Sequence, residues 1–205
     1  MEQNPALRDD QSVAPTLAWL EKNETQSTIV WAPLDSPINN NVTILTKHYV
    51  LFSMGGILHI VTDKEVEERY LLSKAFEPAT IQDLERDYKF YGGSGNAVHA
   101  SKTHNRSVTL CRLLHLNWFG AACGELTDPV TFKGEAYFAG LHKKLNNDIR
   151  PNLVRELASF HVAYLISDNK LHPKLALEIK DRLPNATLVY SDARFSLFKL
   201  ISSAR

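Results

Sequence analysis

The sequence predicts a layered α/β fold with a mixed, mostly parallel sheet, flanking helices and an antiparallel hairpin at the C-terminal end. Short runs of β-branched and aromatic residues alternate with longer amphipathic segments that carry capping signals. The composition of the 205 residues is that of an ordinary folded protein, with 44% hydrophobic and 22% charged residues. We therefore expect a flexible lead-in at 1–12 and one α/β domain at 13–205, with 92–150 as a candidate insertion or helical subdomain.

The first elements are predicted from proline positions and β-rich runs. Pro15 suits the first turn of a helix that ends at Asn23. The runs Thr28–Ala32 and Tyr49–Ser53 predict strands, because both are rich in β-branched and aromatic residues. The three asparagines at 39–41 are interpreted as a polar turn between these strands.

Two capping signals predict the next two helices. Thr62 and Glu65 have the spacing of a capping box, in which each side chain bonds to the backbone of the other residue. Thr80 is the expected cap of a further helix, with Leu84 and Tyr88 on its apolar face. Beyond this helix, the run Ser107–Leu116 is compatible with either a strand or a helix.

The last 70 residues give clearer patterns. Glu135–Asn147 and the segment after Pro151 predict helices. They are followed by predicted elements in the order strand, helix, strand, strand, at Val162–Ser167, Pro173–Leu183, Thr187–Tyr190 and Phe195–Ile201. Strand–helix–strand implies a parallel pair, and the final hairpin adds an antiparallel edge. Leu165 and Ile179 are expected to be fully buried.

The charge distribution limits the classes of partner. Lys and Arg number 23 and so do Asp and Glu, so bulk attraction to nucleic acid is not implied. Residues 1–100 hold 8 basic and 14 acidic side chains, whereas residues 101–205 hold 15 and 9. One interpretation is two solvated faces that partly neutralise each other. The other places the basic half near an anionic surface such as lipid headgroups.

No membrane span or signal peptide is predicted. The longest apolar stretches, Tyr49–Val61 and Leu113–Cys123, fall short of the roughly 18–20 residues that cross a bilayer. The N-terminus is polar and acidic. We expect a water-soluble chain, which is compatible with its being part of a longer membrane protein. Cys111 and Cys123 are compatible with one disulfide, but two buried free thiols are the favoured interpretation.

Motifs for chemistry are weak, and no catalytic, cofactor-binding or metal-binding residue is predicted. The glycine-rich segment 92–95 lacks the lysine of a phosphate-binding loop and is interpreted as a plain loop. His99 and His104 flank a polar loop with Lys102. A metal or phosphate site there is the alternative to a solvated loop, and the loop is favoured.

Two further features are candidates for function. Asp168 and Asp192 each follow a predicted strand, where α/β proteins often place functional groups, although turn formation explains both residues equally well. Trp118 and Phe119 stand beside Gly120 and are interpreted as a candidate apolar contact with a membrane or partner surface.

Several predicted strands and helices resemble, in sequence and in order, those of a known protein family. They are LAWLEKN at 17–23, IVWA at 29–32, ILT at 44–46 before YV at 49–50, TDKEVEERYLL at 62–72, VAYLISD at 162–168, LVYSD at 188–192 and FSLFKL at 195–200. In this order they resemble the soluble C-terminal domain of bacterial polytopic membrane proteins similar to GT-C-type glycosyltransferases. The likeness does not extend over about 92–150, and the asparagines at 39–41 depart from the family pattern.

The resemblance implies a non-catalytic, extracytoplasmic domain, attached to the membrane-embedded part of the same polypeptide. Such a domain would help to position an acceptor or a lipid-linked sugar, with anionic lipid as a further partner. In this family the acidic catalytic residue lies in loops of the membrane part, so no catalytic residue is transferred to this chain. The alternative is a free-standing cytosolic α/β small-molecule-binding protein or enzyme that uses the C-terminal ends of its strands.

Overall fold

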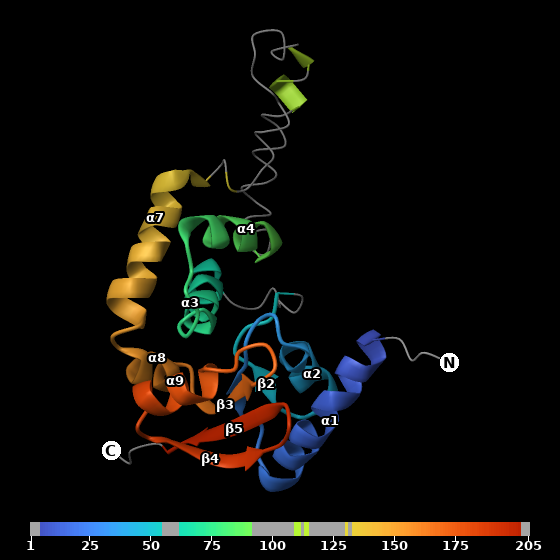
Figure 1. The fold of residues 1–205 in the computed structure, drawn as a ribbon. Coiled ribbons are helices and arrows are strands. Elements are labelled where there is room, and N and C mark those ends of the chain that lie inside the picture. Colours follow the sequence, from blue (N-terminus) through green and yellow to red (C-terminus); the bar gives the residue numbers. More distant parts are fainter. Residues whose placement is uncertain are drawn as a thin grey trace.

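A computed structural model describes residues 5–54, 62–91, 109–111, 113–114, 130 and 133–201 (Figure 1). Apart from α2, whose residues 39–41 were predicted as a turn, the helices and strands within these ranges follow the predicted order. They are α1 (Pro5–Asn23), β1 (Ile29–Trp31), α2 (Pro37–Leu45), β2 (Tyr49–Val50), α3 (Asp63–Ser73), α4 (Ile81–Tyr91), α7 (Glu135–Lys144), the π-helix η3 (Leu145–Ile149), α8 (Leu153–Ser159), β3 (Val162–Asp168), α9 (Leu175–Arg182), β4 (Ala186–Ser191) and β5 (Phe195–Leu200).

The five strands form one mixed sheet in the order β2-β1-β3-β5-β4. β1 pairs in parallel with β2 and β3, whereas β5 pairs antiparallel with both β3 and β4. Four strands therefore run in one direction and β5 runs against them. This confirms the predicted α/β fold, with a mostly parallel strand direction and a C-terminal antiparallel hairpin.

The position of β5 corrects one expectation. We expected β3 and β4 to be neighbours and β5 to be the edge strand, but β5 lies between them. The physical reason is burial: Phe195, Leu197 and Phe198 of β5 are fully buried, whereas Leu188 of β4 is 44% exposed. The more apolar strand takes the interior position, and the half-polar strand takes the edge.

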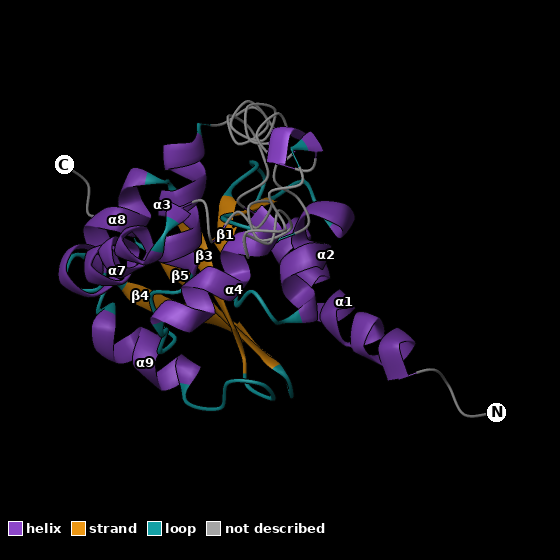
Figure 2. Ribbon diagram, turned by 90° about the horizontal axis from the view of Figure 1, so that it is seen from above, coloured by secondary structure: helices purple, strands orange, loops and turns teal. Residues whose placement is uncertain are grey.

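Helices cover both faces of the sheet (Figure 2). Because successive side chains of a strand point to opposite faces, neighbouring residues enter different cores. Val30 and Ile166 pack with α1 and α2, whereas Trp31 and Leu165 pack with the cluster that includes α3, α8 and α9. The sheet is thus the middle of three layers.

The predicted core residues are confirmed. Leu165 in β3 and Ile179 in α9 are both fully buried in the same hydrophobic cluster. Within the described residues, no helix is both long enough and apolar enough to cross a membrane.

Two predictions about the N-terminal region were wrong. Residues 5–12 form the beginning of α1, so the helix begins before Pro15 and contains this proline in its interior. An interior proline costs about 3 kcal/mol. Packing of Val13, Leu17 and Leu20 against the sheet offsets this cost, since all three are buried.

The predicted turn at 39–41 is part of α2. Ser36 precedes this helix and Pro37 occupies its first turn, an arrangement that favours helix initiation. The Asn39 side chain is buried and donates from Nδ2 to the carbonyl oxygens of Ala32 and Phe52, each at 3.1 Å. The asparagine therefore links the chain after β1 to the chain after β2.

Thr62 and Thr80 cap α3 and α4 as predicted, but the return bond predicted from Glu65 to the Thr62 backbone is not seen among the described residues. The Thr62 hydroxyl accepts from the Glu65 backbone N–H at 3.2 Å at the start of α3. At α4, Thr80 Oγ1 accepts from the Asp83 backbone N–H at 3.2 Å, and Asp83 Oδ2 accepts from the Thr80 backbone N–H at 3.0 Å. Glu65 itself pairs with Arg69 at 2.8 Å, so the reciprocal capping box is at α4.

Candidate functional site

The sheet has a topological switch point between β1 and β3. From β1 the chain crosses through α2, on one face, to β2 on one side of β1. It later reaches β3, on the other side of β1, from α8 on the opposite face. The loops after β1 and β3 therefore diverge at the carboxyl ends of neighbouring parallel strands. In open α/β sheets this crevice is where ligands bind.

Asp168, at the end of β3, joins these two loops. Ser36, after β1, donates from Oγ to Asp168 Oδ2 at 2.8 Å, and Arg194 Nη2 lies 3.2 Å from the same oxygen. Asp168 Oδ1 accepts from the backbone N–H groups of Lys170 and Leu171 at 3.1 and 3.2 Å. The carboxylate is fully buried. Its hydrogen bonds fix the two loops beneath the crevice.

Asp192, the other strand-end aspartate, organises the β4–β5 turn. Its Oδ1 accepts from the backbone N–H groups of Arg194 and Phe195 at 2.8 and 2.7 Å. Its Oδ2 accepts from the hydroxyls of Thr16 and Tyr190 at 2.9 and 3.1 Å. Asp168 and Asp192 were each expected to have either a functional role or a role in turn formation. Their hydrogen bonds to backbone N–H groups of the following residues support turn formation.

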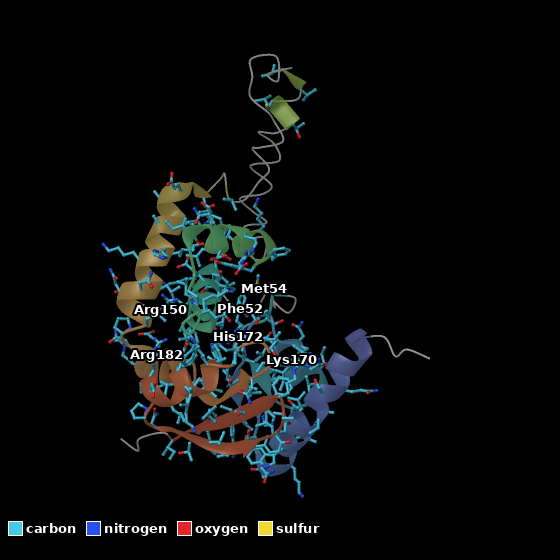
Figure 3. All side chains as sticks on the ribbon, in the orientation of Figure 1. Phe52, Met54, Arg150, Lys170, His172 and Arg182 are labelled. Atoms are coloured by element: carbon cyan, nitrogen blue, oxygen red, sulfur yellow. The ribbon has the colours of Figure 1, made fainter. Side chains whose placement is uncertain are left out.

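An exposed aspartate, Asp35, and a partly buried histidine, His172, form a pair near Asp168 at the crevice. His172 Nε2 is 2.8 Å from Asp35 Oδ1. The His172 backbone N–H donates to the Asp168 carbonyl oxygen at 2.7 Å, which fixes the turn that carries the imidazole (Figure 3). No sequence motif identifies Asp35 or His172 as a functional residue. The pair could have been found from its position in the fold, because Asp35 follows β1, His172 follows β3, and these two strands are neighbours in the sheet.

A pocket of about 350 Å³ adjoins this pair. It lies between the loops after β1 and β2, which supply Leu34 and Met54, and the segment from the end of α3 into α4. Its lining includes four carboxylates and two cations, namely Asp35, Glu77, Asp83, Asp87, Lys74 and Arg86. A carboxylate-rich wall with apolar patches is suited to a neutral or cationic polar ligand.

Lys74 is held between two carboxylates of the pocket. Its Nζ lies 3.2 Å from Glu77 Oε2 and 3.3 Å from Asp87 Oδ2. Burial alone would lower the pKa of Lys74, but the two carboxylates outweigh burial and raise that pKa. Tyr70 donates to Asp87 Oδ2 at 2.9 Å, and burial together with Asp87 raises the pKa of its phenol. At neutral pH Lys74 is therefore a cation and not a free nucleophile.

Two arginines fix the α3–α4 turn that forms one wall. Arg182 Nη1 donates to the Ala75 carbonyl oxygen at 2.9 Å, and Arg150 Nε donates to the same oxygen at 3.3 Å. Arg150 Nη2 also donates to the Glu77 carbonyl oxygen. Figure 3 labels both arginines. Because Arg150 directly follows η3 and Arg182 ends α9, the pocket wall is anchored to the rest of the fold.

Several predicted features lie outside the described residues. These are the candidate contact Trp118–Phe119, the glycine-rich segment 92–95, the loop with His99, Lys102 and His104, and Cys123. Cys111 is described, and it is disulfide-bonded, which corrects the favoured interpretation of free thiols.

Comparison with known proteins shows no family. No family model matches the chain, and no solved structure matches it. A stretch of 67 residues, 32% of this chain, is 34% identical to "Allene oxide synthase, chloroplastic" of Linum usitatissimum. This stretch covers 12% of that protein, so the likeness is to a small part of it.

Proposed function

We propose that this chain is a non-catalytic, extracytoplasmic binding domain of a larger membrane protein that resembles GT-C-type glycosyltransferases. Its pocket at the carboxyl ends of β1 and β2 would hold the sugar part of an acceptor or of a lipid-linked sugar. The observation that carries the proposal is the position of this pocket, which adjoins the switch point and has a preorganised polar lining.

The chemistry of the lining supports a polyhydroxylated ligand. Sugar hydroxyls both donate and accept hydrogen bonds, so they match a wall on which carboxylates accept and Lys74 and Arg86 donate. Leu34 and Met54 add apolar surface for the C–H groups of a sugar ring. Since carboxylates outnumber cations by four to two, the wall disfavours a phosphate group. We propose that the sugar enters and that the phosphate of a lipid-linked sugar stays outside.

The internal pairing of these groups supports binding rather than reaction. Asp87 is bonded to Lys74 and Tyr70, and Arg86 lies 3.2 Å from Asp87 and 3.1 Å from Asp83. Charged groups that already hold one another form a fixed template for a ligand. The role proposed for them is to orient the sugar, while the reaction takes place in another part of the protein.

A second surface supports contact with a membrane. Leu110, Leu113 and Leu114 are 57%, 70% and 58% exposed. Figure 1 places their short segment well beyond α4, far from the sheet. Trp118 and Phe119 follow Leu114 a few residues later in the sequence, and the second half of the chain has an excess of basic residues. Apolar side chains in a basic context suit an anionic lipid surface.

Ligand-observed NMR with a panel of methyl glycosides tests the sugar-binding proposal. We expect at least one hexopyranoside to bind with a Kd of about 1 mM, which is about −4 kcal/mol. The variant Arg86→Gln should weaken binding about tenfold, because Arg86 lines the pocket. Lys89→Gln is the matched control, since Lys89 is an exposed cation on the same helix and is absent from the lining.

The alternative, a free-standing α/β small-molecule-binding protein, would use the same pocket. The two proposals differ in what the rest of the polypeptide contains. Hydrophobic spans encoded upstream in the same reading frame support the membrane protein, whereas a start codon preceded by no such spans supports the free-standing protein. Absence of glycoside binding at 10 mM, or equal binding by the Arg86 and Lys89 variants, would contradict the sugar-binding proposal.

A further inference from the structure

Three side chains of the types that can ligate a metal converge beside the pocket from distant parts of the chain. Asp35 follows β1, Glu77 lies in the α3–α4 turn, and His172 follows β3. One ligand atom from each residue lies within 4.8 Å of the others. No local turn or cap explains this convergence, because the three residues belong to separate segments.

Glu77 provides a second, independent observation. Its Oε2 pairs with Lys74 at 3.2 Å, whereas its Oε1 is buried and has no hydrogen-bond partner among the described residues. A buried acceptor without a partner costs about 1–3 kcal/mol. Such an atom calls for an explanation, and an ion or an ordered water supplies one.

We propose that Asp35, Glu77 and His172 bind a divalent transition-metal ion, for which Zn²⁺ is the reference probe. Imidazole favours zinc and neighbouring transition metals over Mg²⁺ or Ca²⁺, and carboxylates complete such sites. Zinc binds nitrogen and oxygen ligands at about 2.0–2.2 Å, so its ligands lie about 3.3 Å apart in a tetrahedral site. For the ion to bind, the distance between His172 Nε2 and Asp35 Oδ1 would lengthen from 2.8 Å, and the carboxylate of Glu77 would move closer to both residues.

The surroundings hold the three ligands near this geometry. The Ser36–Asp168 hydrogen bond joins the loop of Asp35 to the loop of His172. The α3–α4 turn is anchored at Ala75 and Glu77 by Arg150. Asp35 and Glu77 also line the pocket, so the ion would add positive charge to the carboxylate-rich wall. The metal site itself does not depend on the identity of the pocket's ligand.

Isothermal titration of the full chain with ZnCl₂, after treatment with EDTA and its removal, tests the site. We expect a one-to-one event with a micromolar Kd. Asp35→Asn should weaken it at least tenfold, since loss of a direct ligand costs no less than loss of an outer-shell partner, about 10–100-fold. Because Asp35 is an exposed side chain, 61% accessible, this near-isosteric variant is expected to fold. His172→Ala should abolish the event.

His142→Ala is the control, because His142 lies on α7 and is absent from the metal-ligand cluster. It should bind Zn²⁺ as the unmodified chain does. Co²⁺ provides a spectroscopic readout, with visible absorption in the unmodified chain and none in His172→Ala. Zinc binding that Asp35→Asn and His172→Ala leave unchanged, or no one-to-one event at all, would overturn the proposal and leave a hydrogen-bonded cluster only.

Discussion

Ser36 Oγ donates a hydrogen bond of 2.8 Å to the buried carboxylate of Asp168, and this bond joins the two loops that diverge at the switch point of the sheet. The same carboxylate is paired with Arg194. The Ser36–Asp168 bond brings the loop of Asp35 to the loop of His172, so a buried structural contact sets the position of the Asp35–His172 pair.

Replacing Asp168 by Asn should therefore destabilise the whole fold. The change leaves Arg194 without its buried charge partner, and breaking such a pair costs about 3–5 kcal/mol. Urea unfolding followed by circular dichroism measures the loss. Asp181→Asn, on the exposed face of α9, should change the free energy of unfolding by less than about 0.5 kcal/mol. Equal effects of the two variants would contradict this role for Asp168.

Truncating a buried side chain of the central strand should lower stability, because it removes buried apolar surface and leaves a cavity. Leu165 is fully buried in β3, so Leu165→Ala should lower the free energy of unfolding by about 2–5 kcal/mol. Leu188→Ala, in the edge strand β4, is the matched control and should cost much less because Leu188 is 44% exposed. A thermal melt unchanged for Leu165→Ala would mean that β3 is not in the core.

The capping box of α4 makes a smaller, local prediction. Thr80→Ala removes the hydroxyl that accepts from the Asp83 backbone N–H, and loss of such a cap costs about 1 kcal/mol. Thr80→Ser keeps the hydroxyl and should restore most of the stability. Chemical denaturation of the three proteins checks this order. Equal losses for Ala and Ser would show that the methyl group of Thr80, rather than its hydroxyl, matters.

The Asp192 carboxylate predicts a pH dependence. Burial acts to raise the pKa of Asp192, but donation from the Phe195 and Arg194 backbones and from the Thr16 and Tyr190 hydroxyls outweighs it and lowers the pKa. A lowered folded-state pKa stabilises the fold above the unfolded-state value of about 3.9 and loses this contribution as pH falls through the folded-state value.

The gap in the free energy of unfolding between the unmodified chain and Asp192→Asn should therefore be largest near pH 6. It should narrow as the pH falls toward 2.5. Urea titrations at a series of pH values measure this gap, and a gap that stays constant over this range would contradict the account.

The fold was predictable where local patterns and tertiary packing agree. The β-branched and aromatic run Thr28–Ala32 and the capping signals at Thr62 and Thr80 predict elements that the structure contains. The asparagines at 39–41 were mispredicted because Asn has low helix propensity, whereas in the fold Asn39 bonds two carbonyl groups across neighbouring loops. Tertiary contacts overrode propensity at this position.

The candidate site was less predictable than the fold. Asp35, Glu77 and His172 are separated by more than 40 residues at each step, and no motif joins them. They meet because β1 and β3 are neighbours in the sheet and the α3–α4 turn reaches the carboxyl ends of these two strands. The strand-end position of Asp168 pointed to the end of the sheet where the candidate site lies, but the predicted strand order did not define which other loops reach it.

Chemical-shift mapping by ¹⁵N NMR tests the central claim, that the pocket beside the switch point binds a sugar, most directly. Titration with the best-binding methyl glycoside should shift backbone amides in three places: in the loop that carries Asp35, in the loop that carries Met54, and at Asp83–Asp87 of α4, all of which border the pocket. Amides of Ala186 and Thr187 at the start of β4, the opposite end of that strand from the β4–β5 turn, should stay unchanged. Saturable shifts confined to the start of β4 or to the leucine-bearing segment 109–114, with none around the pocket, would contradict the account.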